Sequence, residues 1–446
     1  MKQIHLGYAL FNYGTHPAGW TSHTKDIATN IEHFKRCARI AEEAKFDMLF
    51  RADALFCHTK NIEAWSRNPY HMNSIEPLTL LAALSQVTSK IGLAGTVSTS
   101  YSEPYNIARQ LASLDHVSHG RAAWNVVTSA STQAAKNFGE SKIPSHEERY
   151  GRAKEYVEAV QALWDTYEDD AFVLDPSTGY HFDPKKFHPV SYSGKYIRVE
   201  GALNVARPPQ GYPVLVQAGS SGPGKQFAAE TAEVVFSLSR DKRAAQAFYK
   251  DMQDRVSSAG RDRSSFKVLP ALVVVVGETK AEAEAYYASL EARVPNIVKL
   301  EELSLDLGVD ITKLPLDRPV PLEMLPTDTN YIAGIFQAAA ELVRTGKPLG
   351  EILPFYRQPS AGTPLCGSAA EISDFIEEWV ADGACDGFNI ISPSEPRGLE
   401  TLAANVIPEL QRRGSFRREY EGNTLRDHFG LPRPKSRHSK SGDTRG

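Results

Sequence analysis

The feature that most constrains this chain is a regular alternation of short apolar runs with amphipathic helical patterns. Between the first two runs, Ile27, Ile31 and Phe34 fall three or four residues apart, which places them on one face of a helix. Such an alternation is typical of repeated βα units and a parallel sheet. Eight strands are expected, at residues 4–10, 46–52, 91–97, 121–128, 213–217, 234–237, 268–276 and 387–392. Eight such units favour a closed (β/α)8 barrel over an open sheet.

The alternation is interrupted twice and stops before the end of the chain. Residues 169–212 are rich in Pro, Gly, Tyr and Asp, which indicates an insertion loop or a small hairpin. Residues 294–330 are rich in proline, and we expect them to form a lid. From 432 to 446 the chain carries five Lys or Arg and one Asp, which indicates a disordered basic tail, with a nucleic-acid-binding arm as the alternative. Residues 1–431 are therefore expected to form a single barrel domain with two insertions.

The composition argues against several classes of protein. The 446 residues carry a formal net charge of −4 and are 41% hydrophobic, so a large core is possible and nothing suggests a nucleic-acid partner. Cys37, Cys57, Cys366 and Cys385 lie far apart without a CxxC pair, which argues against a disulfide framework or zinc site and fits a reducing compartment. We find neither a signal peptide nor an apolar run long enough for a membrane helix. We expect a cytoplasmic protein that binds no membrane.

The segment PVLVQAGSSGPGKQ, residues 213–226, predicts an anion site. A strand runs into a Gly-Ser loop that opens a helix, where free backbone N–H groups and the helix dipole attract a phosphate. Gly219 to Lys225 matches the GxxxxGK part of a nucleotide-binding loop, but Gln226 stands where a Ser or Thr should bind magnesium. We therefore interpret the loop as a phosphate site rather than an ATPase site, with an ordinary glycine-rich turn as the alternative.

A second candidate is the run HEERY, from His146 to Tyr150. These two side chains are four residues apart at the start of a helix and share a face. The run fails the HExxH zinc motif because Tyr150 replaces the second histidine, so no metal is expected. Two interpretations remain open, a pair of donors for a phosphate or oxyanion and a helix start with solvated charges.

Polar residues recur at the carboxyl ends of the expected strands, where barrel enzymes carry their active sites. Such residues commonly cap loops, but their repetition at one end of the barrel favours a functional site. They are Asn12, His16, Asp53, Thr96, Ser98, Thr99, Asn125, Thr128, Ser129, Ser220 and Ser221. The aromatic residues near the same ends that could hold a flat ring are Phe11, Trp20, Phe56 and Trp124.

Several long motifs resemble one known family. They are TVSTSYSEPYNIARQLASLDHVSHGRAAWNVVTS, then NFG and HEERY, and later PVLVQAGSSGPGKQFAAETAEVVF. The chain is similar over nearly its whole length to bacterial-luciferase-like flavin monooxygenases, and within them to the group of nitrilotriacetate monooxygenase component A, dibenzothiophene-sulfone monooxygenase and long-chain alkane monooxygenase. The resemblance implies a TIM barrel with insertions and a two-component reaction. A separate NAD(P)H:FMN oxidoreductase supplies FMNH2, which reacts with molecular oxygen to a flavin hydroperoxide that oxygenates a small organic substrate.

The resemblance also assigns expected roles to individual residues. Asp53 and either Thr96 or Thr99 would contact the flavin ring or its ribityl chain, and Asn125 would lie beside the ring. The residues on the phosphate side would be His146, Tyr150, Ser220 and Ser221. His16 in GTHPAGW would border the substrate as the catalytic residue, for proton transfer or orientation, although Thr15 and Gly19 depart from the family's pattern.

Three other classes of protein are alternatives to a monooxygenase. The first is a deazaflavin-dependent oxidoreductase of the same superfamily, the second is an ATPase, and the third is a flavin-binding protein without turnover. The resemblance implies a homodimer or homotetramer. Arg51, Arg67 and Arg207 are candidate members of a cluster that would bind an anionic substrate.

Overall fold

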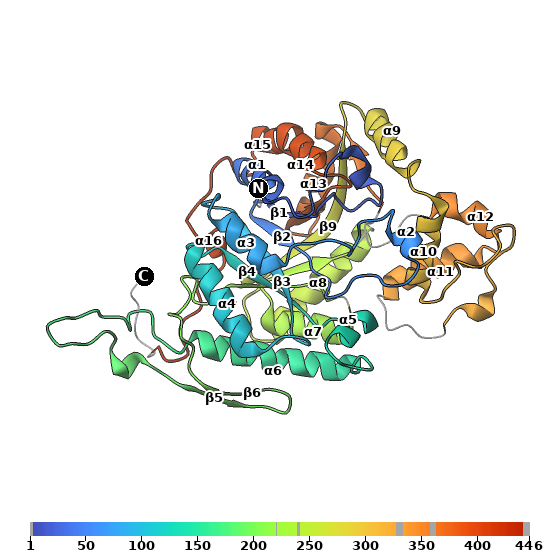
Figure 1. Ribbon diagram of the computed structural model, residues 1–446. Coiled ribbons are helices and arrows are strands. Elements are labelled where there is room, and N and C mark those ends of the chain that lie inside the picture. Colours follow the sequence, from blue (N-terminus) through green and yellow to red (C-terminus); the bar gives the residue numbers. More distant parts are fainter. Residues whose placement is uncertain (1–2, 220, 239–240, 327–332, 357–362, 440–446) are drawn as a thin grey trace.

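Eight parallel strands close into a barrel in the computed structural model, which describes residues 3–219, 221–238, 241–326, 333–356 and 363–439 (Figure 1). In order around the barrel they are β1 (His5–Ala9), β2 (Met48–Arg51), β3 (Gly92–Ser98), β4 (Ala122–Val127), β7 (Val214–Gln217), β8 (Val234–Ser237), β9 (Lys267–Val276) and β11 (Gly387–Ile391). The last strand pairs with the first, with Gly7 opposite Asn389. The predicted TIM barrel and its eight strands are therefore confirmed.

Helices form the outer layer, and most begin with a side-chain cap. The longer ones are α1 (Ile31–Glu43), α3 (Pro77–Ser85), α4 (Pro104–Val117), α6 (His146–Trp164), α7 (Gly222–Thr231), α8 (Lys242–Ser258) and α13 (Ala369–Ala381), followed by α14 (Arg397–Thr401), η6 (Leu402–Val406) and α15 (Ile407–Arg413). In α4 the predicted stripe Ile107, Leu111 and Leu114 is buried, but Val117 in the last turn is 47% exposed. The short elements are η1 (Gly19–Ser22), α2 (Ile62–Trp65), α5 (Thr132–Asn137) and η3 (Arg263–Ser265).

Side chains that alternate along the strands form two apolar layers. Residues such as Met48, Phe50 and Val216 fill the barrel interior, whereas Leu49 and Trp124 belong to the cluster between the strands and the outer helices. Trp124 therefore supports α6 and does not face a ligand in the barrel. The long strand β9 contributes to both layers, as its nearly continuous apolar sequence predicts.

A short helix near the carboxyl end, α16 (Leu425–Phe429), closes the end of the barrel at which the strands begin. Leu425 and Phe429 belong to the interior apolar cluster, and the ring of Phe429 packs against His5 at 5.1 Å between centroids. Gly92, the first residue of β3, makes room for this helix, since a Cβ there would lie 2.4 Å from Leu425. Five residues are too few for a periodic pattern, so the sequence does not predict α16.

Asp47, just before β2, is a fully buried carboxylate at the same end of the barrel. It accepts a hydrogen bond from the Leu6 N–H at 2.7 Å, lies 3.0 Å from His5 Nδ1 and pairs with Arg417. Burial alone would raise the pKa of Asp47, but the charges of Arg417 and His5 outweigh it and lower the pKa below 3.8.

We predict that Asp47→Asn lowers the free energy of unfolding at pH 7 by about 3 kcal/mol, because it leaves Arg417 buried without its partner. A lowered pKa in the folded state stabilises the fold at pH values above the ordinary value of Asp, and this stabilisation is lost as the pH falls through the folded-state value. Urea unfolding of both proteins at pH 7 and pH 3.5 should therefore show a smaller difference at the lower pH. A difference independent of pH would contradict this account.

The first interruption, residues 169–212, projects from the barrel, and we call it the arm (Figure 1). It contains η2 (Pro184–Lys186) and an antiparallel hairpin of β5 (Val190–Ser193) and β6 (Arg198–Gly201), in agreement with the hairpin alternative. Four large apolar side chains on the arm are exposed, namely Phe172, Val173, Leu174 and Tyr180.

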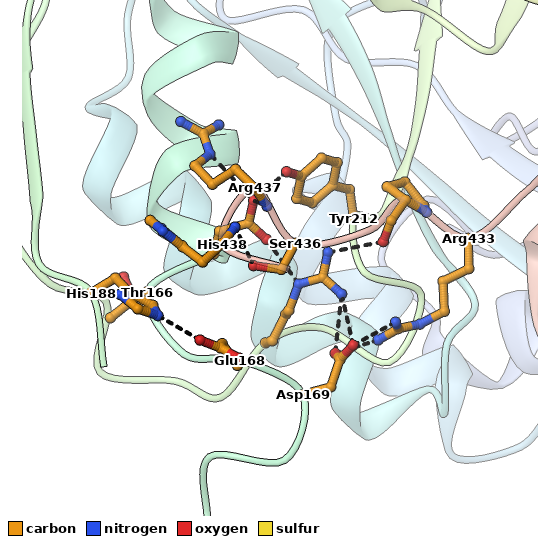
Figure 2. Close-up of polar contacts among 12 residues, drawn as sticks. Thr166, Glu168, Asp169, His188, Tyr212, Arg433, Ser436, Arg437 and His438 are labelled. Carbon is orange, nitrogen blue, oxygen red and sulfur yellow. Dashed lines mark hydrogen bonds and ion pairs between the residues drawn. The ribbon is translucent and has the colours of Figure 1, made fainter. Parts of the chain in front are cut away.

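The first part of the segment expected to be disordered lies against the base of this arm (Figure 2). Residues 432–439 run across it, and Arg433 forms an ion pair with Asp169 at 2.6 Å. Other contacts join Arg207 to the Pro434 carbonyl at 2.9 Å and stack His438 on His188 at 3.8 Å. Residues 440–446 lie outside the described residues.

The second interruption contains more helix than its prolines suggest. Beyond β9 lie α9 (Lys280–Glu291), α10 (Asn296–Leu307), η4 (Leu322–Met324), α11 (Ala333–Arg344), α12 (Leu349–Ile352), η5 (Leu353–Phe355) and β10 (Leu365–Gly367), which pairs with β9. The elements α10 to α12 share an apolar core of their own, separate from the barrel clusters. Across the described residues, no helix has both the length and the apolar character that crossing a membrane requires.

Candidate functional site

The two motifs that are expected to donate hydrogen bonds to an anion, residues 146–150 and 213–226, meet at the carboxyl ends of the strands. Ser221 caps α7 by accepting a hydrogen bond from the Gly224 N–H at 3.2 Å, and its Oγ lies 3.2 Å from His146 Nε2. His146 is the first residue of α6, whose start is fixed by a capping box between Ser145 and Glu148. The amino ends of α6 and α7 therefore converge, which concentrates N–H groups and positive dipole ends. Ser220 lies outside the described residues.

Two glycines allow this convergence. A Cβ at Gly219 would lie 2.9 Å from the Gly224 carbonyl carbon, so the loop can fold back on the helix only without a side chain. A Cβ at Gly224 would lie 2.8 Å from Tyr150 Oη and 3.0 Å from Ser221 Oγ. The turn thus brings the polar groups of Tyr150, Ser221 and His146 close together with no side chain between them, and we call this group of residues the cradle.

Arg149 adds a buried positive charge beside this cradle, and no sequence pattern predicts this role. The residue is 9% exposed, its Nη1 donates to the Ser129 carbonyl at 3.4 Å, and its Nε has no hydrogen-bond partner among the described residues. Burial lowers the pKa of Arg149. Partial burial, together with the Arg149 charge, also lowers the pKa of His146, so His146 is neutral at pH 7. A guanidinium with an unused N–H favours an anion in the cradle.

Inside the barrel, Asn125 and Thr96 form a polar pair. They are direct neighbours in the register of β3 and β4, and Asn125 Nδ2 donates to Thr96 Oγ1 at 2.8 Å. The Thr96 hydroxyl donates in turn to the Arg51 carbonyl at 2.9 Å. Asn125 Oδ1 is buried and has no partner among the described residues, which is costly unless a ligand N–H or water satisfies it.

The other predicted residues lie around the same end of the barrel. Thr99 is completely buried, and its hydroxyl donates to the Val127 carbonyl at 3.2 Å, where it holds the turns after β3 and β4 together. Asp53 follows β2, and burial together with the nearby Glu76 raises the pKa of its carboxyl, while Arg51 opposes this shift. Thus Thr96 belongs to the Asn125 pair, and Thr99 has a backbone partner of its own.

His16 is held on both sides of its ring. The Ala18 N–H donates to His16 Nδ1 at 3.1 Å, and Nε2 lies 3.3 Å from Glu291 Oε1. Because Nδ1 accepts a hydrogen bond, the proton of the neutral ring is on Nε2 and points at Glu291. The Tyr287 ring packs edge-on against His16 at 5.3 Å. Both partners lie on α9, far away in the sequence, so no local pattern could reveal them.

The arginines proposed to cluster are instead separate. Arg51 donates to Leu10, Asn12 and Ser74 and holds two loops together. Arg67 pairs on the surface with Glu63. Arg207 pairs with Asp165 and Asp169 at the base of the arm. The three candidate arginines therefore have separate partners in the structure.

Comparison with known proteins identifies the family. A model described as luciferase-like monooxygenase matches residues 11–381. The chain belongs to the luciferase-like monooxygenase family. N-acetyl-S-(2-succino)cysteine monooxygenase from Bacillus subtilis (strain 168) is 43% identical, over 98% of this chain and 99% of that protein. Nitrilotriacetate monooxygenase component A from Aminobacter aminovorans is 41% identical, over 98% of each. EDTA monooxygenase from Chelativorans sp. BNC1 has a similar structure, with a TM-score of 0.76 and 33% identity over 97% of this chain and 100% of that chain.

The resemblance inferred from the motifs is therefore confirmed. This monooxygenase is a flavin-dependent enzyme built on a TIM barrel, and its relatives match it along almost their whole length. The polar cradle and the Asn125 pair lie at the end of the barrel where enzymes of this fold carry their active sites.

Proposed function

We propose that this monooxygenase is the oxygenating component of a two-component system. It would receive FMNH2 from a separate NAD(P)H:FMN oxidoreductase and use molecular oxygen to oxygenate a small organic molecule. The observation that carries the proposal is the cradle between α6 and α7, where His146, Ser221 and the buried Arg149 converge. These donors fit a phosphate, and the unpaired Asn125 Oδ1 fits an N–H of the flavin ring.

Each group of residues has a part in this proposal. Reduced flavin supplies the activation of oxygen, and the protein binds it, orients it and excludes water. Arg149, His146, Tyr150 and Ser221 would hold the phosphate, with Ser220 proposed beside them. Thr96, Asn125, Asp53 and Thr99 would lie along the ring and the ribityl chain. His16 would orient the substrate, because its N–H is fixed by Glu291.

Anaerobic titration with FMNH2, oxidised FMN, a deazaflavin and magnesium-ATP tests this proposal. We expect FMNH2 to bind more tightly than the other three and to be consumed on addition of oxygen. Preferential binding of the deazaflavin, without consumption of oxygen, would instead support a hydride-transfer enzyme. Binding of ATP alone would overturn the proposal.

We predict that Gly224→Ala raises the Kd for FMNH2 by roughly tenfold, since the added methyl group collides with Tyr150 Oη and narrows the cradle. Gly222→Ala is a suitable control, because a Cβ there meets nothing within 4 Å. Fluorescence titration under anaerobic conditions measures both constants. Equal effects of the two substitutions would place the phosphate elsewhere.

The substrate we propose is a small carboxylated thioether or amine. Two relatives above 40% identity are named for N-acetyl-S-(2-succino)cysteine and nitrilotriacetate, which carry carboxylates beside a sulfur or a nitrogen. Product formation from a panel of such compounds, measured against hydrogen peroxide release, tests the assignment. Coupled turnover of an uncharged sulfide or an alkane alone would contradict it.

A homodimer or homotetramer remains our proposal for the assembly. The exposed apolar side chains of the projecting arm, with Leu174 66% and Tyr180 55% exposed, are the surface we expect a second copy to cover. Light scattering of the purified enzyme and of Leu174→Asp tests this. An unchanged mass for the variant would mean that the arm is not the contact.

A further inference from the structure

Two buried carboxyl groups lie one turn apart on α10, outside the site described above. Glu302 and Asp306 are 3% and 1% exposed. Asn68, in the loop after β2, donates to Glu302 Oε1 at 2.8 Å, and Tyr356 donates to Asp306 Oδ2 at 2.6 Å. The charge of Asp306 lies close enough to disfavour ionisation of Glu302.

Among the described residues neither Glu302 nor Asp306 forms an ion pair, and Lys299, one turn earlier on α10, donates instead to Glu291 at 3.1 Å. Two ionised carboxylates that are buried together without a cation are strongly unfavourable. The lack of an ion pair among the described residues therefore favours a proton on at least one of the two carboxyl groups when α10 is seated as observed.

The charges that face Glu302 agree with this conclusion. Burial, the neighbouring Asp306 and the more distant Glu291 raise the pKa of Glu302 to about 8, against smaller opposing effects of Asn68 and Lys299. Burial raises the pKa of Asp306 to about 6, although the Tyr356 hydroxyl opposes it. Burial, together with the nearby Asp306 and Glu302, raises the pKa of the Tyr70 hydroxyl to about 12, so this group is not ionised at neutral pH.

The rest of this contact combines hydrogen bonds with buried side chains, since Ala64 and Trp65 are each 2% exposed. Trp65 donates to Glu301 on α10 at 3.1 Å, and Asn61 donates to the same carboxylate. The ring of His58 lies flat on Trp65 at 3.5 Å, and burial lowers the pKa of His58 to about 4, so it is neutral.

A shift of α10 away from the loop need not disrupt the apolar core of its own side. The helices α10 to α12 share an apolar core of their own, and in Figure 1 they lie beside the barrel, next to α2. Residues 61–73 belong to the loop that begins after β2 at Asp53, so they lie at the carboxyl ends of the strands. A shift of α10 away from this loop therefore changes access to that end of the barrel.

We propose that α10 and residues 61–73 form a proton-controlled latch. Protonated Glu302 keeps α10 docked on the loop, and loss of its proton releases α10 and opens the end of the barrel that carries the site. The latch controls access to the barrel, and the proposal does not depend on which flavin or substrate the enzyme uses.

The direction of the pH effect follows from proton linkage. The docked state binds the Glu302 proton more tightly than an open state, in which the carboxyl has its ordinary value near 4.5. Docking is therefore most stable below pH 4.5 with respect to this group and weakens as the pH rises toward 8. The Asp306 proton acts in the same direction, from 3.8 to about 6.

Hydrogen–deuterium exchange of the full-length enzyme tests the latch without any flavin chemistry. The reporters are the Ala64, Trp65, Ser66 and Asn68 amides, each of which donates a backbone hydrogen bond within the loop. After correction for the intrinsic rate, we expect these amides to exchange at least about tenfold faster at pH 9 than at pH 6. The amides of α4 should show no such change.

Glu302→Gln should remove this pH dependence, since glutamine keeps the acceptor for Asn68 and cannot ionise. Glu341→Gln makes the same chemical change at an exposed position of α11 and should behave like the wild type. If Glu302→Gln does not fold, Asp306→Asn serves instead, and it should move the transition to lower pH by removing the neighbouring charge. A wild type without pH-dependent exchange, or a Glu302→Gln variant that keeps it, would overturn the proposal.

Discussion

Replacing Arg149 by methionine is expected to raise the Kd for FMNH2 by roughly 100-fold, with a smaller change in the turnover of enzyme that still binds it. The residue is buried beside His146 and has an unused N–H, so its charge meets a bound phosphate without competition from solvent. Methionine keeps the length of the side chain and removes its charge and its donors. Arg149→Lys should recover part of the affinity, because a lysine keeps the charge but lacks the planar pair of donors.

Arg109→Met is the matched control for this experiment, since Arg109 is exposed on α4. Anaerobic titration should leave its affinity for FMNH2 at the wild-type level. Removing the phosphate from the ligand provides a second check, because riboflavin should bind to wild type and Arg149→Met with similar affinity. A large difference for riboflavin would show that Arg149 acts through the fold and not through the phosphate.

Replacing Arg121 by methionine is expected to lower the free energy of unfolding by about 4 kcal/mol. Arg121 is 1% exposed and lies where α3 and α4 end. Its guanidinium donates to the carbonyls of Ser85, Thr88, Ile91 and Ser118 and to the Thr88 hydroxyl. These carbonyls include the unpaired groups at the negative ends of two helices, so one cation satisfies several buried acceptors at once.

Urea unfolding followed by circular dichroism measures this loss, again with Arg109→Met as the control. We expect the midpoint to fall for Arg121→Met while the slope of the transition stays the same. The binding of FMNH2 at low temperature should remain, because Arg121 precedes β4 and the cradle lies at the other end of the strands. A loss of binding in a folded variant would contradict this separation.

Much of the barrel was predictable because its signals are local. Each strand is a short apolar run, and the stripe of Phe34, Ala38 and Ala41 places α1 without any knowledge of its neighbours. The helix α16 and the strand β10 are too short for a periodic pattern and exist only through their tertiary contacts. The order of residues 432–439 was equally unpredictable, because it depends on contacts with residues distant in the sequence, such as Asp169.

In the candidate site, too, residues in local motifs were predictable and residues defined by tertiary contacts were not. His146, Tyr150 and Ser221 lie in motifs whose local geometry makes them donors, and the structure brings them together. Arg149 belongs to the same HEERY run, but only packing against the turn at Ser129 buries it and gives its charge a direction. Glu291 became visible as the partner of His16 only in three dimensions.

The closure of the barrel imposes a delay between the synthesis of β1 and the synthesis of the elements that cover it. β1 pairs with β11, and α16 fills the end of the barrel at which the strands begin, so β1 depends on residues that leave the ribosome much later. At about 5–20 residues per second, these partners emerge roughly 20 to 80 s after β1. During that interval the edge of β1 is unpaired and exposed to aggregation. Chaperones that bind nascent chains should therefore protect this enzyme more than one whose first strand pairs only with its neighbours in sequence.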